Sequence, residues 1–237
     1  MSEHSASAEA TSLVDQLSTA SNRFAQPRSA PERVADFLRE EIVQGRLGSG
    51  TQLTEESISG TLSVARNTVR EAFTLLTAER LVAREPHRGV FVRQLSLPDI
   101  ADLYRMRRIV EPSALRSGPE FGEHSVDLLE AAVSEGYRAQ QAEDRHGVAS
   151  ANQEWHRHAV GIAGSQRLDH TMSGLLAEMR LVFAQMDNDV DFHAKYLARN
   201  EEITSIAAQG ERGRAADALD AYLAEASADI QASLSSE

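Results

Sequence analysis

The chain has 237 residues and a mass of 25.9 kDa, which suits one large domain or two modest ones, and its 41% hydrophobic content is enough to bury a core. It contains no cysteine, which excludes disulfide scaffolds, zinc fingers, iron–sulfur clusters and cysteine nucleophiles. The net charge of −12 argues against nucleic-acid binding by the chain as a whole, and the lack of a signal peptide or of an apolar run of about 20 residues predicts a cytoplasmic protein without membrane contact.

The N-terminal segment, residues 1–30, is rich in serine, alanine and threonine, and we expect it to form a mobile tail. Pro31 suits the first turn of a helix, and Val34, Leu38 and Ile42 follow at helical spacing. The glycines at positions 45, 48 and 50 then end this first predicted helix.

Two further helices and a hairpin are predicted next. Thr54 can cap a short helix, and a third helix begins near Ala65. The pattern then changes to that of two short strands, at residues 81–84 and 90–93, joined by a turn. Three helices plus a β-hairpin within about 65 residues form the pattern of a winged helix-turn-helix.

The third predicted helix carries the most informative pattern in the chain. Arg66 and Arg70 lie four residues apart and therefore on one helical face, with Asn67 beside them. Such a face can place arginine on guanine edges and asparagine on adenine. Residues 60–94 hold six arginines against three glutamates, whereas the remainder of the chain is strongly acidic. The alternative is an ordinary amphipathic helix whose arginines are only solvated.

The stretch from Glu32 to Arg93 resembles the winged helix-turn-helix of GntR-type bacterial transcription regulators. The likeness includes residues 45–47, residues 64–73 and the closing residues 88–92. In that family the N-terminal end of the third helix enters the major groove and the wing reaches the minor groove. The resemblance therefore implies these DNA-contact candidates: Arg66, Asn67, Thr68, Arg70, Arg88 and Gly89.

The sequence departs from that family at several positions. Ala65 stands where a hydroxyl residue is usual, and Arg80 replaces the glycine that usually follows the third helix. Glu56 lies where some members place a basic DNA contact. The operator sequence therefore cannot be predicted from the family.

Beyond a linker at residues 95–97, the chain shows helical periodicity and no convincing strand. The breaks predict helices at residues 98–117, 124–146, 148–163, 168–187, 191–209 and 214–233. We therefore expect a mainly α protein with an N-terminal winged helix-turn-helix domain at residues 31–94 and a C-terminal all-α helical-bundle effector domain at residues 98–237.

This second half resembles the helical effector domain of the FadR/FCD type, through Arg107, the Glu111-Pro112 pair and the run from Asn152 to His156. The resemblance implies an effector pocket lined by Arg107, Asn152, His156, Asn200 and Tyr222, in which Arg107 binds an anion. Two other interpretations stay open. Arg107 can instead form a buried salt bridge with Glu111, four residues on, and His156 can be a core histidine bonded to a neighbour.

Many domains of this type hold a divalent metal through one carboxylate and three histidines. The corresponding positions here are Asn152, His156, Asn200 and Tyr222, and amides and a phenol are poor ligands for Zn²⁺ or Ni²⁺. We therefore expect no tightly bound metal and no cofactor. His193 is the nearest residue that could replace a lost ligand.

Together these patterns favour a ligand-responsive transcription regulator, expected to be a repressor. The resemblance implies a homodimer on a pseudo-palindromic operator in double-stranded DNA, and a small-molecule effector expected to be an organic acid. A metal-dependent hydrolase or another enzyme in the helical bundle is the main alternative, but the sequence has no phosphate loop, nucleophile elbow or His-Glu-x-x-His helix. A third hypothesis, a protein-interaction module with a vestigial DNA-binding part, conflicts with the arginines at positions 66, 70 and 88.

Overall fold

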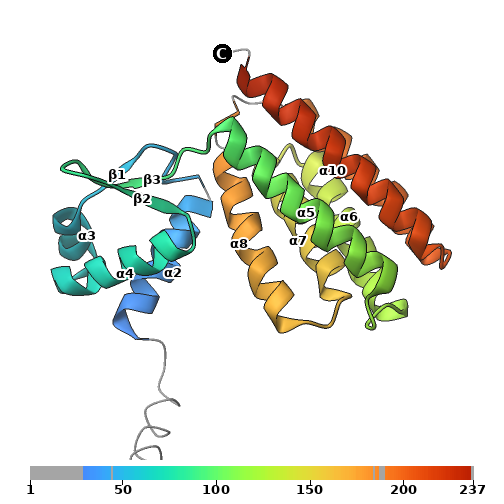
Figure 1. The fold of residues 1–237 in the computed structure, drawn as a ribbon, viewed down its shortest axis with the longest axis horizontal. Coiled ribbons are helices and arrows are strands. Elements are labelled where there is room, and N and C mark those ends of the chain that lie inside the picture. The colour runs from blue at the N-terminus through green and yellow to red at the C-terminus, as the bar shows by residue number, and fades with distance from the viewer. Residues whose placement is uncertain (1–28, 44, 184, 187–189, 236–237) are drawn as a thin grey trace, which may run out of the picture.

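The computed structural model describes residues 29–43, 45–183, 185–186 and 190–235, and for residues 190–194 it describes the backbone alone. The tail expected at residues 1–30 lies almost entirely outside these ranges. The elements form two groups along the chain (Figure 1). The first group contains α2 (Ala30–Val43), β1 (Gln52–Leu53), α3 (Glu55–Leu62), α4 (Arg66–Ala78), β2 (Val82–Glu85) and β3 (Gly89–Val92).

The helices of the first group share one small core. Val34, Leu38 and Ile42 of α2 are buried, as are Val69 and Phe73 of α4. These residues recur every three or four positions, so each helix presents one apolar face to the other. The exposed face of α4, which carries the arginines, is therefore left to solvent.

The sheet of the first group has three strands in the order β1-β3-β2, all antiparallel. The pairing of Val82 with Val92 and of Glu85 with Gly89 forms the predicted hairpin. The sequence analysis missed β1, in which Gln52 pairs with Phe91. Two residues are too few to show an alternating pattern, and β1 exists because its backbone completes hydrogen bonds to β3.

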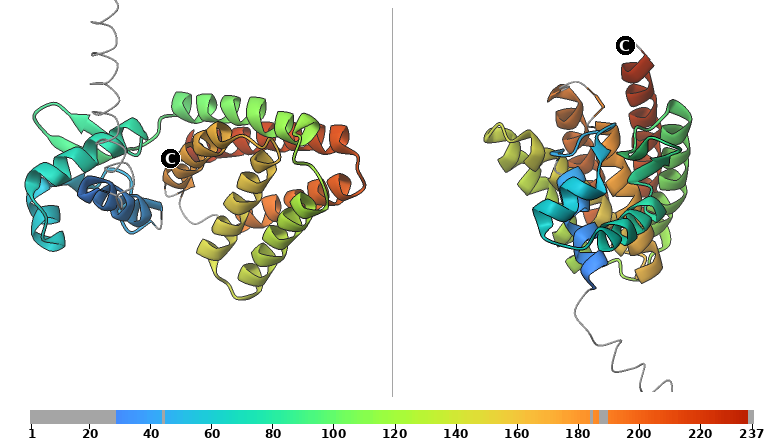
Figure 2. Two further views of the ribbon diagram at one scale, coloured as in Figure 1. Left: turned by 90° about the horizontal axis from the view of Figure 1, so that it is seen from below. Right: turned by 90° about the vertical axis from the view of Figure 1, so that its left-hand side faces the viewer.

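The second group is helical throughout its described residues. It contains α5 (Leu97–Ser117), α6 (Glu123–Gln141), α7 (Arg145–Gly161), α8 (Gln166–Phe183), α9 (Val190–Ala208) and α10 (Arg212–Ser235). The long helices α5 and α10 run side by side along one face, whereas α8 lies toward the first group (Figures 1 and 2). None of the helices in the described ranges is both long and apolar enough to cross a membrane.

One predicted helix break was wrong. The sequence analysis placed it at Gly147, but Gly147 lies in the first turn of α7, and the break falls at residues 142–144. Glu143 adopts a left-handed backbone with φ of 57°, and the Asp144 side chain accepts a 2.9 Å hydrogen bond from the Gly147 N–H. A side-chain cap thus starts the helix earlier than the glycine suggested.

Candidate functional site

The N-terminus of α4 brings three of the predicted DNA-contact residues together. Arg66, Asn67 and Thr68 form its first turn, and Arg66 and Asn67 are exposed. Ala65 is the N-cap and makes no side-chain capping bond. The first backbone N–H groups of the helix therefore stay available to an anion such as a phosphate.

The arginines of this face are paired with carboxylates. Arg66 lies 3.2 Å from Glu56, and Arg70 donates to both oxygens of Glu55, at 3.0 and 2.7 Å. The hydrogen bond from Arg70 holds the pKa of Glu55 below its ordinary value. Because these pairs are exposed, they are weak and can exchange for phosphate or base contacts.

The wing positions the remaining two candidates. Arg88 pairs with Glu85 and lies over the ring of Phe91, 5.2 Å from its centroid. Gly89 has a φ of 115°, which L side chains rarely adopt. The Gln52 side chain donates a 2.7 Å hydrogen bond to the Arg88 carbonyl and so holds the tip of the wing.

The structure adds Arg84, which the sequence analysis did not include among the candidates. It is exposed on β2, where its neighbours Val82 and Ala83 are more buried. Its charge helps to lower the pKa of Glu55, so it lies near the Arg70–Glu55 pair. The signal in the sequence was the alternation of the predicted strand, which places Arg84 on the solvent side.

The five predicted effector-site residues lie in one buried cluster in the second group, together with Glu111. Four helices contribute them: α5 (Arg107, Glu111), α7 (Asn152, His156), α9 (Asn200) and α10 (Tyr222). We call these six residues the polar cluster.

A chain of close polar contacts runs through the polar cluster. Arg107 Nε donates to Glu111 at 2.6 Å, and the other Glu111 oxygen lies 2.6 Å from His156 Nδ1. His156 Nε2 lies 3.0 Å from the Tyr222 hydroxyl. The Asn152 side-chain oxygen is 3.4 Å from that hydroxyl and accepts a 2.7 Å bond from Asn200.

Glu111, which sequence reasoning treated only as a possible partner of Arg107, is the centre of this chain. Burial raises the pKa of Glu111, but the charge of Arg107, with hydrogen bonds from His156 and Arg107, outweighs burial and holds the pKa below its ordinary value. The carboxylate is therefore ionised and can only accept hydrogen bonds. Arg107 and Glu111 form the buried salt bridge that one interpretation of the sequence expected.

The protonation of His156 follows from its partners. Burial lowers the pKa of His156 against the attraction of Glu111, so the ring is neutral. Since ionised Glu111 cannot donate, Nδ1 carries the hydrogen, and Nε2 accepts from the Tyr222 hydroxyl. Trp155 stands edge-on to His156 and donates a 2.8 Å bond to Thr204, which makes it a core residue.

Two buried side-chain atoms of the described residues have no hydrogen-bond partner: Arg107 Nη2 and Asn200 Oδ1. Both belong to the polar cluster. An unpaired buried donor or acceptor typically costs about 1–3 kcal/mol, so native proteins rarely leave one without a reason. The polar cluster thus has one donor and one acceptor without a protein partner.

The residues of the polar cluster do not fit a divalent transition metal. His156 is their one imidazole, and both of its nitrogens are already within hydrogen-bond distance of neighbours. The remaining family positions offer two amides and a phenol. No group of three or more His, Asp or Glu suited to a metal occurs in the described part of the chain, and the side chain of His193 lies outside that part.

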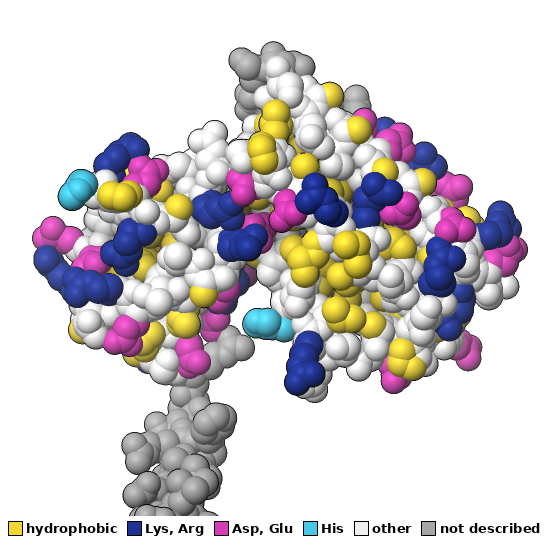
Figure 3. Space-filling view, viewed as in Figure 1, with side chains coloured by type: hydrophobic (Ala, Val, Ile, Leu, Met, Phe, Trp, Pro, Cys, Tyr) yellow, Lys and Arg dark blue, Asp and Glu magenta, His cyan; other side chains and the backbone are white. Residues whose placement is uncertain are grey.

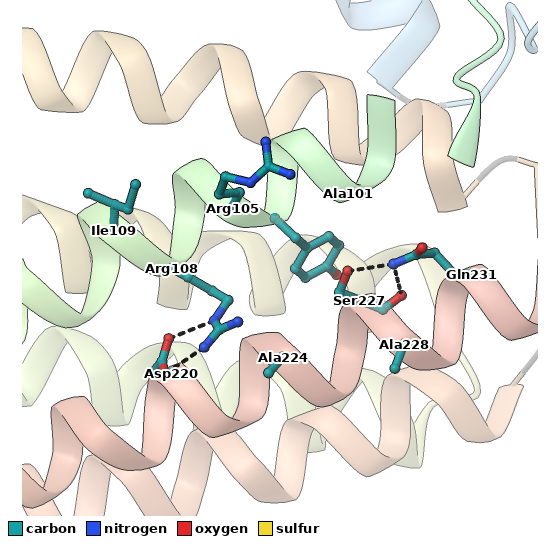
Figure 4. A pocket seen from close by; sticks show the side chains of 10 residues that line it. Ala101, Arg105, Arg108, Ile109, Asp220, Ala224, Ser227, Ala228 and Gln231 are labelled. Carbon is teal, nitrogen blue, oxygen red and sulfur yellow. Dashed lines mark hydrogen bonds and ion pairs between the residues drawn. The ribbon is translucent and has the colours of Figure 1, made fainter. Parts of the chain in front are cut away.

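A separate open groove of about 520 Å³ lies between α5 and α10 (Figure 4). Its lining is mixed, with alanines at its base, the Arg108–Asp220 ion pair at 2.7 Å and the exposed Ile109 at one end. Met106 and Ile109 are 41% and 65% exposed, which is high for apolar side chains. On the same side of the molecule, hydrophobic side chains form a patch bordered by arginines (Figure 3).

Comparison with family models identifies both groups of elements. Residues 30–92 match the model described as bacterial regulatory proteins, gntR family. Residues 102–225 match the FCD domain model.

Solved and curated relatives agree with these matches. A GntR-type transcriptional regulator from Rhodococcus sp. RHA1 has a structure 39% identical in sequence, with a TM-score of 0.80 over 86% of this chain and 98% of that one. The probable D-xylose utilization operon transcriptional repressor of Paenarthrobacter nicotinovorans is 28% identical over 67% of this chain and 70% of its own length. The HTH-type regulator BphR of Paraburkholderia xenovorans is 41% identical, but the match spans only 39% of this chain and 38% of that protein.

Proposed function

Because this chain belongs to the GntR family of bacterial regulatory proteins and carries an FCD domain, we propose that it represses transcription by binding an operator that it releases or retains according to a small-molecule effector. GntR regulators bind DNA operators, and the chain is a ligand-responsive DNA-binding regulator of this kind. Repression is proposed because one curated relative, matched over 70% of its length, is named as a probable repressor. The alternative of an enzyme in the helical bundle finds no support among the relatives.

The observation that carries the proposal is the shared exposed face of α4 and the wing. In our proposal Arg66, Asn67, Thr68 and Arg70 read the major groove, while Arg88 and Gly89 enter the minor groove. Arg84 adds a phosphate contact between them. Arginine suits this task because its planar guanidinium can donate two parallel bonds to one guanine.

We propose that residues 95–97 separate the two domains, with Leu97 at the start of α5. We also propose that the effector binds at the polar cluster. Support comes from the two unpaired buried atoms, which lie in the cluster and nowhere else among the described side chains. Effector and operator binding are then linked, so each changes the affinity for the other by the same factor.

We also propose a homodimer whose two copies meet at the groove between α5 and α10. The groove carries Arg105 and Arg108 from α5 and Asp220 from α10, and within one copy Arg108 already pairs with Asp220. A two-fold axis would bring the same surface of two copies together. It also covers Ile109, which is otherwise exposed to water.

The test is fluorescence anisotropy with a labelled DNA fragment from upstream of the protein's own gene, titrated at several salt concentrations. We expect tighter binding to this fragment than to an unrelated one of equal length, with an affinity that falls linearly on a log–log plot against salt. Equal affinity for the two fragments would contradict operator recognition, whereas no binding to either would contradict DNA binding altogether.

A further inference from the structure

The charges of the polar cluster cancel within the cluster itself. Arg107 and Glu111 are 3% and 0% exposed, and their 2.6 Å contact pairs one positive with one negative charge. His156 is neutral because burial lowers its pKa. Burial likewise raises the pKa of Tyr222 and brings that of the neighbouring Tyr104 to about 12, so both phenols are neutral.

A bound carboxylate would disturb this balance. It would bring one negative charge into a site where the positive charge of Arg107 is already neutralised by Glu111 at close range. Burying an uncompensated charge is costly, because water no longer solvates it. The carboxylate would also offer only acceptors to Asn200 Oδ1, which is itself an acceptor without a partner.

A hydroxyl group can form a hydrogen bond with either unpaired atom, Arg107 Nη2 or Asn200 Oδ1, without adding charge. Its oxygen can accept from Arg107 Nη2, and its hydrogen can be donated to an acceptor such as Asn200 Oδ1. Arg107 and Asn200 stand at the two ends of the chain of polar contacts, so a molecule with hydroxyls on more than one carbon can serve both.

From this match we propose that the effector is a small neutral polyhydroxylated molecule, of the sugar or polyol class, whose hydroxyls bind Arg107 Nη2 and Asn200 Oδ1. The inference rests on the proposed function, since it takes the polar cluster as the effector site. This ligand class replaces the organic acid expected from the sequence. Glu111 already neutralises the positive charge of Arg107, which an acid would need as its partner.

The test uses the full chain and the fluorescence of Trp155, the one tryptophan in the sequence, whose ring centroid lies 5.1 Å from that of His156. The probes are three matched pairs: glycerol with glycerate, xylose with xylonate, and glucose with gluconate. We expect at least one neutral member to change the fluorescence at a concentration at least about tenfold lower than its acid. Tighter binding of any acid than of its neutral partner overturns the proposal, as does the absence of a response to all three neutral probes at about 50 mM.

Two variants test the charge argument directly. Glu111→Gln leaves Arg107 without a counter-charge, so the preference should reverse toward the acid by about tenfold. The double variant Arg107→Gln/Glu111→Gln restores a neutral cluster and should again reject the acid. A Glu111→Gln protein that folds, as judged by circular dichroism, and keeps the wild-type preference would overturn the proposal.

A third variant serves if Glu111→Gln does not fold. Asn200→Leu removes the unpaired acceptor without changing charge and should weaken the best neutral probe by about tenfold; unchanged binding overturns the proposal. Operator binding is measured on the same samples. If the wild-type protein binds operator DNA but does not prefer the neutral probes to the acids, only the proposed ligand class is overturned. If the wild-type protein binds no operator, the proposed function itself is contradicted.

Discussion

Arg93, the residue after β3, donates a 3.0 Å hydrogen bond to Glu178 of α8 and so joins the DNA-binding part of the chain to the FCD part. Its other terminal nitrogen donates to Asp99 at 3.0 Å. Helix α8 is tied in turn to α7 of the polar cluster, because Gln153 donates to the Leu176 carbonyl at 2.9 Å. Polar contacts through α8 therefore connect α7, on which we propose that the effector acts, with Arg93.

Removing Arg93 should lower the free energy of unfolding by more than neutralising its partner Glu178 does. Glu178 is buried, and burial raises its pKa against the attraction of Arg93. We expect Arg93→Ala to lower the free energy of unfolding by about 2 kcal/mol, because it strands a buried carboxylate, and Glu178→Gln to lower it by less than about 1 kcal/mol. Urea denaturation measures both, with the exposed Arg138→Ala as the control; equal effects at Arg93 and Glu178 would refute the asymmetry.

The exposed arginines of α4 should matter for operator binding and little for folding. Arg66→Ala or Arg70→Ala should weaken operator binding by ~1–3 kcal/mol if each guanidinium binds a guanine. Glu56→Gln should strengthen it, since Glu56 pairs with Arg66 in the free protein and repels phosphate. Anisotropy at fixed salt measures these changes, and Arg138→Ala, an exposed arginine of α6, is the control. Wild-type affinity in both arginine variants would exclude this face as the reading surface.

The buried His156 should make the protein less stable in mild acid. Burial lowers its pKa in the folded state below the ordinary 6.5, so the unfolded chain takes up a proton first as the pH falls. Its stabilising contribution is present above about pH 6.5 and is lost as the pH falls toward the folded pKa, with a slope of up to about 1.4 kcal/mol per pH unit.

Denaturation curves between pH 7 and pH 5 check this contribution. His156→Gln should flatten the slope without abolishing it, because burial also lowers the pKa of the half-buried His158. An unchanged slope in His156→Gln would mean that this histidine is not held neutral in the folded protein.

The groove between α5 and α10 should control the oligomeric state. We expect a wild-type dimer, and Ile109→Asp should give a 25.9 kDa monomer, because it puts a charge where the proposed interface covers an exposed apolar side chain. Phe37→Asp changes an exposed apolar residue elsewhere and should leave the dimer intact. Light scattering at micromolar concentration decides, and a dimeric Ile109→Asp variant would place the interface on another face.

Much of the architecture was predictable because it depends on the spacing of residues that are close together in the sequence. The apolar repeats of α2 and α4, the cap at Thr54 and the alternation of β2 and β3 involve residues within a few positions of one another. The four-residue spacing of Arg66 and Arg70 likewise depends only on the geometry of one helix. The family resemblance then named five of the six residues of the polar cluster by position, all except Glu111.

The tertiary structure decided which partners these residues contact. Glu111 meets His156 across 45 positions of sequence, and Arg93 meets Glu178 across 85. No local period encodes such contacts, because they form only where folding removes water and every buried polar atom needs a partner. The sequence alone therefore determined which surface carries the arginines and which helices form the bundle. The spacing of Arg107 and Glu111 on one helix already allowed their salt bridge, but only the packing of the helices brought Glu111 to His156 and left one donor and one acceptor unpaired in the cluster.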